Sequence, residues 1–195
     1  DFGDAIRSYA NTGEEDDRDL SRVGMSLDMT YFQDADGRSY YAWQQLGATY
    51  IATMDPKDPA HVTSSPVRIV TPEYAWNAAI AEGPNVTLRD GKLYLMFSGS
   101  GVGKTYTTGL AVADASGTDL TDPASWTVLN YPIQKSGPFN GEMQLGTGHG
   151  MWSEDEDGNQ IYVFHAYATK NLGSVNAAGR DMFVRRVHWA ADGMP

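Results

Sequence analysis

Residues 82–97 read Glu-Gly-Pro-Asn-Val-Thr-Leu-Arg-Asp-Gly-Lys-Leu-Tyr-Leu-Met-Phe, in which an Asp-Gly pair separates two strand-like runs. Asp-Gly in this setting predicts a β-hairpin, because glycine adopts the positive φ that a tight turn requires. The same order of strand, Asp-Gly turn and aromatic-rich strand recurs at 28–43 and at 149–164. The three turn glycines lie 54 and 67 residues apart, at Gly37, Gly91 and Gly158. A repeat of about 60 residues is typical of four-stranded propeller blades with moderate loops.

The composition also predicts an all-β protein. The chain has 21 Gly, 9 Pro and 11 Tyr, and no window of about a dozen residues keeps the apolar spacing of an amphipathic helix. The repeat units are expected at roughly 26–80, 81–147 and 148–195. Residues 1–25, with an acidic run from Glu14 to Asp19, are expected to form a solvated segment between blades.

The charge balance excludes several classes of partner. Of 195 residues, 14 are Lys or Arg and 25 are Asp or Glu, which gives a net charge of −11. Nucleic acids and anionic membrane surfaces would be repelled by such a surface, and the longest apolar runs, such as 92–97, are too short to span a bilayer. The absence of cysteine excludes disulfides, Cys-ligated zinc and thiol nucleophiles. We therefore expect neither a nucleic acid partner nor a membrane partner.

Three polar residues stand at one position of the repeat. Asp28, Glu82 and His149 each lie nine residues before a turn glycine. Equivalent positions on the first strands of successive blades face the central axis of a propeller. The spacing therefore predicts that these three side chains converge on one site.

At these residues the chain resembles glycoside hydrolase family 43, and the resemblance runs from about Met25 to Pro195. It rests on five segments in the family's order: Ser26-Leu-Asp28-Met-Thr, Ala81-Glu82-Gly83-Pro84, Gly148-His149-Gly150, Asp122-Pro-Ala-Ser-Trp126 and Trp189-Ala-Ala-Asp-Gly-Met-Pro195. The family has a five-bladed β-propeller, of which this chain would supply about three blades.

The resemblance implies an inverting α-L-arabinofuranosidase that releases arabinofuranosyl units from plant cell-wall polysaccharides or oligosaccharides. Such hydrolysis needs one carboxylic acid to protonate the leaving oxygen and one carboxylate to activate water. Glu82 matches the family's general acid, and Asp28 matches the carboxylate that raises the pKa of that acid and orients it. The family's general base, on the first blade, has no match in this chain.

Further site residues follow from the same resemblance. His149 matches a residue at the propeller axis where family members hold calcium, and a hard cation prefers oxygen ligands, so we expect contact through water. Trp76 and Trp152 are candidate stacking surfaces for a sugar ring, and Arg180 is a candidate donor to a sugar hydroxyl or carboxylate. His165 is expected to be a core residue or to contact the residues of the site rather than the substrate. No organic cofactor is implied.

The repeat count predicts an incomplete ring. Three blades cannot close a propeller, and open strand edges favour association. We therefore expect an N-terminal fragment or a second chain to complete the propeller and to supply the general base. The resemblance favours an extracellular or periplasmic location.

Other functions remain open at this stage. Tyr74-Ala-Trp76 resembles the arabinofuranosidase members more than the β-xylosidases or endo-arabinanases of the same family. A non-catalytic carbohydrate-binding propeller would keep the fold and the aromatic residues while lacking the base. A phosphate loop at 99–105 is not expected, because Ser98 stands where its first glycine is required.

Overall fold

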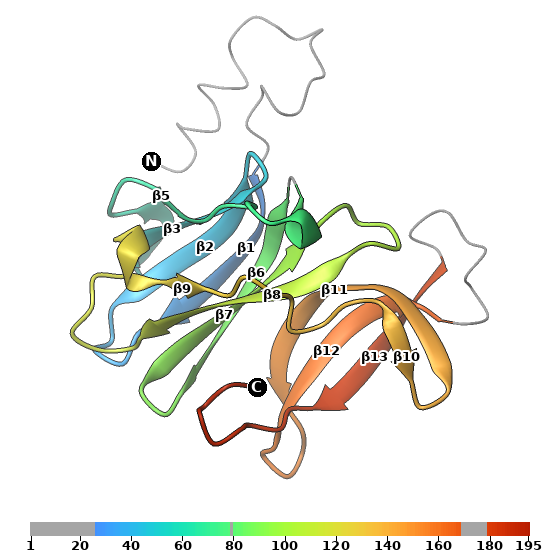
Figure 1. Ribbon diagram of the computed structural model, residues 1–195. Coiled ribbons are helices and arrows are strands. Elements are labelled where there is room, and N and C mark those ends of the chain that lie inside the picture. Colours follow the sequence, from blue (N-terminus) through green and yellow to red (C-terminus); the bar gives the residue numbers. More distant parts are fainter. Residues whose placement is uncertain (1–25, 79, 169–178) are drawn as a thin grey trace, which may run out of the picture.

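The computed structural model describes residues 26–78, 80–168 and 179–195, and the acidic run between Glu14 and Asp19 lies outside these ranges. The predicted all-β fold is confirmed, since the described strands form three sheets that lie side by side (Figure 1). Two short 3-10 helices, η1 (Ala75–Asn77) and η2 (Pro123–Ser125), lie in the connections. Nowhere in the described ranges is there a helix with the length and apolar character to cross a membrane.

Every named strand pair in these sheets is antiparallel. The first sheet contains β1 (Ser26–Gln33), β2 (Ser39–Gln45), β3 (Ala48–Asp55) and β4 (Asp58–Val62) in that order, with β5 (Val67–Val70) also paired to β3. The second sheet contains β6 (Ala81–Arg89), β7 (Lys92–Gly99), β8 (Thr107–Asp114) and β9 (Thr127–Val128). The third sheet contains β10 (Gly137–Phe139), β11 (Glu142–Glu154), β12 (Gln160–Tyr167) and β13 (Arg180–Arg186).

The turn glycines behave as their Asp-Gly context predicts. Gly37, Gly91 and Gly158 have φ values of 81°, 76° and 77°, in the left-handed region where a side chain is unfavourable. The third sheet starts earlier than the unit 148–195, because β10 pairs with the first residues of β11 through a hairpin at 140–141.

The β7 strand lies at the centre of the molecule and is buried on both faces. Successive side chains of a strand point to opposite faces. Accordingly, Leu95 and Phe97 pack into a cluster shared with the first sheet, whereas Met96 packs against Phe164 of the third sheet. In Figure 1 the second sheet correspondingly lies between the other two. The three sheets are thus packed face to face through apolar layers.

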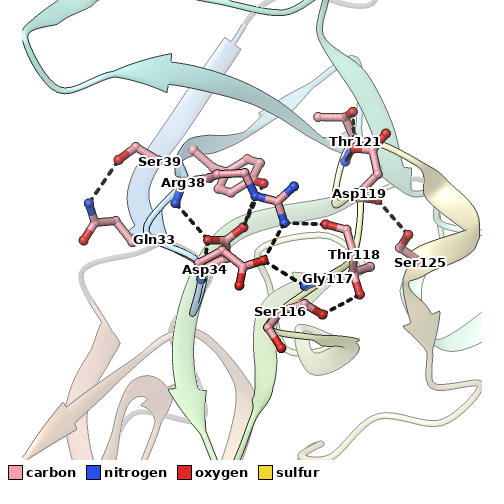
Figure 2. Close-up of polar contacts among 12 residues, drawn as sticks. Gln33, Asp34, Arg38, Ser39, Ser116, Gly117, Thr118, Asp119, Thr121 and Ser125 are labelled. Atoms are coloured by element: carbon pink, nitrogen blue, oxygen red, sulfur yellow. Dashed lines mark hydrogen bonds and ion pairs between the residues drawn. The ribbon is translucent and has the colours of Figure 1, made fainter.

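A buried carboxylate holds the arginine that joins the first sheet to the second. Asp34 follows β1, and its side chain accepts hydrogen bonds from the Arg38 Nε at 2.6 Å and from the Tyr40 hydroxyl at 3.1 Å. Arg38 also donates to the carbonyl of Thr118 at 2.6 Å, across the gap between the sheets (Figure 2). Asp36 accepts from the backbone N–H of Gly117 at 2.8 Å. These contacts fix the loop after β8 against the first hairpin.

Candidate active site

Each of the strands β1, β6 and β11 contains a β-bulge. The register of pairing shifts by one residue between Leu27 and Thr30, between Glu82 and Asn85, and between Gly148 and Met151. Inside these bulges one residue has a left-handed backbone, at φ values of 60°, 58° and 48° for Asp28, Gly83 and His149. Non-glycine residues in this conformation are strained and gather at functional sites, and a bulge re-aims the side chains beside it.

The structure brings Asp28, Glu82 and His149 together, but Glu82 does not occupy the same position of its strand as the other two. In the pairing of these strands, Gly83 and not Glu82 stands at the bulge position that Asp28 and His149 occupy. The hairpins differ in two ways: two residues separate the last pair of β6 and β7, whereas five separate the last pair of β1 and β2, and the paired stretch after the bulge is one residue longer in β6 than in β1. Counting nine residues back from a turn glycine therefore ends at different depths.

Glu82 is a buried carboxyl group, with 7% of its surface exposed. Its Oε1 accepts a hydrogen bond of 2.5 Å from the Tyr106 hydroxyl. Burial raises the pKa of Glu82, the Tyr106 hydrogen bond lowers it, the negative charge of Asp28 raises it, and His149 lowers it, in that order of size, with a net shift upward. A carboxyl group held in this way keeps its proton to higher pH than an exposed one.

Asp28 links the Glu82 strand to His149. Its Oδ2 accepts from the backbone N–H of Gly83 at 3.1 Å, and its Oδ1 lies 3.8 Å from Nε2 of His149. The three bulges, at 28–30, 83–85 and 149–151, line one hollow with a volume of about 240 Å³. Asp28 and His149 thus line one open hollow, and the buried Glu82 directly precedes Gly83, which lines it too.

His149 is held by its backbone as well as by its ring. Its N–H donates to the Ser98 hydroxyl at 2.7 Å, and its Nδ1 lies 3.3 Å from the Tyr106 hydroxyl. Across the described ranges, no three His, Cys, Asp or Glu side chains gather closely enough to ligate a metal. Calcium held through water at His149 stays a prediction.

Two residues that spacing did not single out complete this cluster, Tyr106 and Ser98. Tyr106 is fully buried, and its ring stacks on His165 with centroids 5.7 Å apart. No repeat position marks Tyr106 in the sequence, because it lies before β8, which carries no motif. Its role is visible only once β6, β7 and β8 are placed in one sheet, with β7 between the other two.

His165 stacks on the Tyr106 ring, and Arg180 contacts His165. Nη1 of Arg180 lies 3.0 Å from Nε2 of His165, and a guanidinium can only donate. Burial, with the nearby charges of Arg180 and His149, lowers the pKa of His165 to about 4, so the imidazole is neutral near pH 7. His165 supports the Tyr106 ring, and the predicted contact of Arg180 with a sugar stays a prediction.

The two candidate tryptophans pack elsewhere. Trp76 donates from Nε1 to the carbonyl of Asn130 at 3.0 Å and stacks on Phe97 at 6.0 Å. Trp152 donates to the carbonyl of Tyr94 at 3.1 Å and lines a second hollow, of about 190 Å³, between the second and third sheets. Neither lines the hollow at Asp28, and their sugar-stacking roles stay predictions.

Propeller-like sheets with a buried carboxyl group beside a second carboxylate define a candidate carbohydrate-cleaving site. The chain belongs to Glycosyl hydrolases family 43, which it matches over residues 15–195. Its solved relatives are β-propellers, and the chain corresponds to part of one. The predicted family and propeller fold are thereby confirmed.

Curated and solved relatives are similar over most of this chain. An extracellular exo-alpha-(1->5)-L-arabinofuranosidase of Streptomyces avermitilis is 32% identical over 183 residues, covering 87% of this chain and 37% of that protein. A protein of the same name from Streptomyces chartreusis is 33% identical and covers 75% of this chain and 46% of its own length. The crystal structure of an alpha-L-arabinofuranosidase from Lactobacillus brevis has a TM-score of 0.77 at 29% identity, over 88% of this chain and 55% of that one. The chain thus spans about half or less of the length of these relatives.

Proposed function

We propose that this chain is the acid-bearing part of an inverting α-L-arabinofuranosidase that acts on plant cell-wall polysaccharides or oligosaccharides. The observation that carries the proposal is the environment of Glu82, which is buried, has a pKa raised by burial and by the charge of Asp28, and directly precedes Gly83 at the hollow. The named activity of the relatives at 32–33% identity supports the choice of arabinofuranosides.

The chemistry assigns one role to each carboxyl group. Glu82 gives its proton to the glycosidic oxygen as the bond from that oxygen to the anomeric carbon breaks, and the leaving group departs as an alcohol. Water adds to the opposite face of the anomeric carbon and loses its proton to a carboxylate base. Asp28 raises the pKa of Glu82 through its charge and anchors Gly83, the neighbouring residue. We assign the base to the part of the protein outside this chain.

The third sheet offers a surface for that remaining part. On its outer face Met151, Val163 and Val184 lie in register across three strands. Met151 and Val184 are about half exposed, and Met182 on the same face is 74% exposed. An apolar sheet face of this kind is stabilised when a further sheet covers it. We propose that the remaining blades of the propeller, whether in the same polypeptide or in a second chain, pack there.

Substrate and location follow the relatives' names. The solved β-xylosidase and endo-arabinase neighbours, at 19% and 21% identity, share the fold, whereas the more similar relatives are named arabinofuranosidases. Two of them are also named extracellular, and we propose the same location here. Hydrolysis of 4-nitrophenyl α-L-arabinofuranoside but not of the β-D-xyloside by the complete protein is the expected result.

The decisive experiment is Glu82→Gln in the complete protein. We expect kcat on an unactivated arabinoside to fall roughly 10²- to 10⁴-fold, the usual range for loss of a general acid. Glu154→Gln, at an exposed glutamate of β11, is the matched control and should leave kcat unchanged. NMR of the first-formed sugar should show inversion at the anomeric carbon. Undiminished activity of Glu82→Gln would refute the assignment, and sugar binding without hydrolysis by either protein would favour a non-catalytic propeller.

A further inference from the structure

The Tyr106 hydroxyl is the group that connects Glu82 to His149. It donates to Oε1 of Glu82 at 2.5 Å and lies 3.3 Å from Nδ1 of His149. Oε2 of Glu82 has no hydrogen-bond partner among residues 26–78, 80–168 and 179–195, yet it is not one of the fully buried unpaired atoms. The two oxygens of the carboxyl group therefore have different environments.

The phenol keeps its proton throughout the working pH range. Burial, with the hydrogen bond to Glu82 and the charge of that group, raises the pKa of Tyr106 far above its ordinary value. A protonated phenol that faces a carboxylate donates to it. Oε1 is thus occupied as an acceptor, and a proton bound to Glu82 is placed on the other oxygen.

The Tyr106 ring is also fixed in place. Gly148 has no side chain where the ring passes, and a Cβ at that position would collide with the ring carbons. On its other side the ring stacks on His165, which Arg180 holds by a hydrogen bond. The hydroxyl therefore cannot leave Glu82 by a simple rotation of the side chain.

We propose that Tyr106 is a positioning residue, whose hydroxyl occupies Oε1 of Glu82 so that Oε2 carries the proton given to the leaving oxygen. The inference rests on the proposed role of Glu82 as general acid. Without the hydroxyl, the proton can sit on either oxygen, so that only part of the protonated Glu82 would carry it on Oε2. The loss should therefore matter most when the leaving group needs protonation.

The test is Tyr106→Phe in the complete protein, assayed on two aryl arabinofuranosides. Phenol is a poor leaving group that needs the acid, whereas 2,4-dinitrophenolate leaves without it. We expect kcat to fall roughly 10- to 100-fold on the phenyl substrate and less than about threefold on the dinitrophenyl substrate. The basic limb of kcat/KM should move to higher pH, because the lost hydrogen bond lowered the pKa of Glu82.

Tyr162→Phe is the matched control, since Tyr162 is a buried tyrosine whose hydroxyl lies 2.7 Å from Oγ1 of Thr108 rather than at Glu82. It should leave both the leaving-group dependence and the pH profile unchanged. Replacement of Tyr106 by 3-fluorotyrosine, a stronger hydrogen-bond donor of nearly the same shape, should move the basic limb of the kcat/KM profile to lower pH. This variant tests the inference if Tyr106→Phe fails to fold.

Equal losses of Tyr106→Phe on both substrates with an unmoved basic limb would overturn the inference and show a purely structural role. The proposed function has its own readout in Glu82→Gln. If Glu82→Gln shows the leaving-group dependence and Tyr106→Phe does not, the general acid stands and the positioning role falls. If neither shows it, the proposed function itself falls.

Discussion

The backbone N–H of Gly83 donates to Oδ2 of Asp28 over 3.1 Å, although 55 residues separate them in the chain. This hydrogen bond joins the bulge of β6 to the bulge of β1 immediately beside Glu82. The Asp28 carboxylate therefore has two effects on the candidate acid, a mechanical one through Gly83 and an electrostatic one through its charge.

Asp28→Asn separates those two effects. The amide oxygen can still accept from Gly83, but the negative charge that raises the pKa of Glu82 is lost. The pKa of Glu82 should then fall, Glu82 should lose its proton at lower pH, and the basic limb of kcat/KM should move to lower pH. A shift of one unit corresponds to about a tenfold loss above that limb. Asp157→Asn, at an exposed turn carboxylate, should leave the limb in place, and an upward movement with Asp28→Asn would contradict the argument.

Gly83→Ala tests the bulge itself. Both Gly83 and Gly37 have positive φ, so alanine at either should lower the free energy of unfolding by about 1–2 kcal/mol. At Gly83 the new Cβ would also come within 3.2 Å of Cε1 and Nδ1 of His149, whereas at Gly37 it meets nothing within 4 Å. Urea denaturation and kcat together should show a loss of stability for both variants and a loss of activity for Gly83→Ala alone. Full activity of Gly83→Ala would argue against a role for this geometry.

Asp34→Ala should destabilise the contact between the first two sheets. The Asp34 side chain is fully buried, and its removal leaves the Tyr40 hydroxyl without the partner it has in the structure. We expect a loss of about 2–4 kcal/mol in the free energy of unfolding, measured by urea denaturation. Lys92→Ala, which breaks an exposed pair with Asp114, should cause no resolvable change. A similar effect of both variants would show that burial of Asp34 is not what matters.

Trp76→Ala distinguishes packing from sugar binding. The ring lies on Phe97 and Tyr74, so its removal should lower the free energy of unfolding by about 3 kcal/mol. The KM for an arabinofuranoside, measured well below the melting temperature, should stay the same if packing is its whole role. Unchanged stability with a raised KM would instead support the predicted stacking on substrate.

Much of the fold could be predicted because its signals are local. The Asp-Gly turns at Gly37, Gly91 and Gly158 depend on a few residues and on the φ that glycine tolerates. The aromatic-rich runs after them form β2, β7 and β12. The convergence of Asp28, His149 and the Gly83 position beside Glu82 could also be predicted, because a repeat places corresponding strand positions around one axis.

The details of the site could not be predicted in the same way. A bulge such as the one at Gly83 shifts the register of strand pairing by one residue. Counting residues between repeats reveals neither that shift nor the unequal lengths of the loops. Tyr106 reaches Glu82 because β6 and β8 both pair with β7, which lies between them, and the repeat spacing does not record that pairing. The positions of Trp76 and Trp152 likewise depend on contacts with residues distant in the sequence, such as Asn130 and Tyr94.

The amino-acid sequence by itself therefore determined the all-β repeats, their turns and the residue types at the axis, because these depend on backbone preferences over a few neighbouring residues. Only the tertiary structure decided that Glu82 is buried, that Asp28 anchors Gly83 and that Tyr106 occupies Oε1. Burial and long-range hydrogen bonds arise from the packing of sheets that are distant in the chain. Those contacts set the protonation of a carboxyl group, and therefore its chemistry.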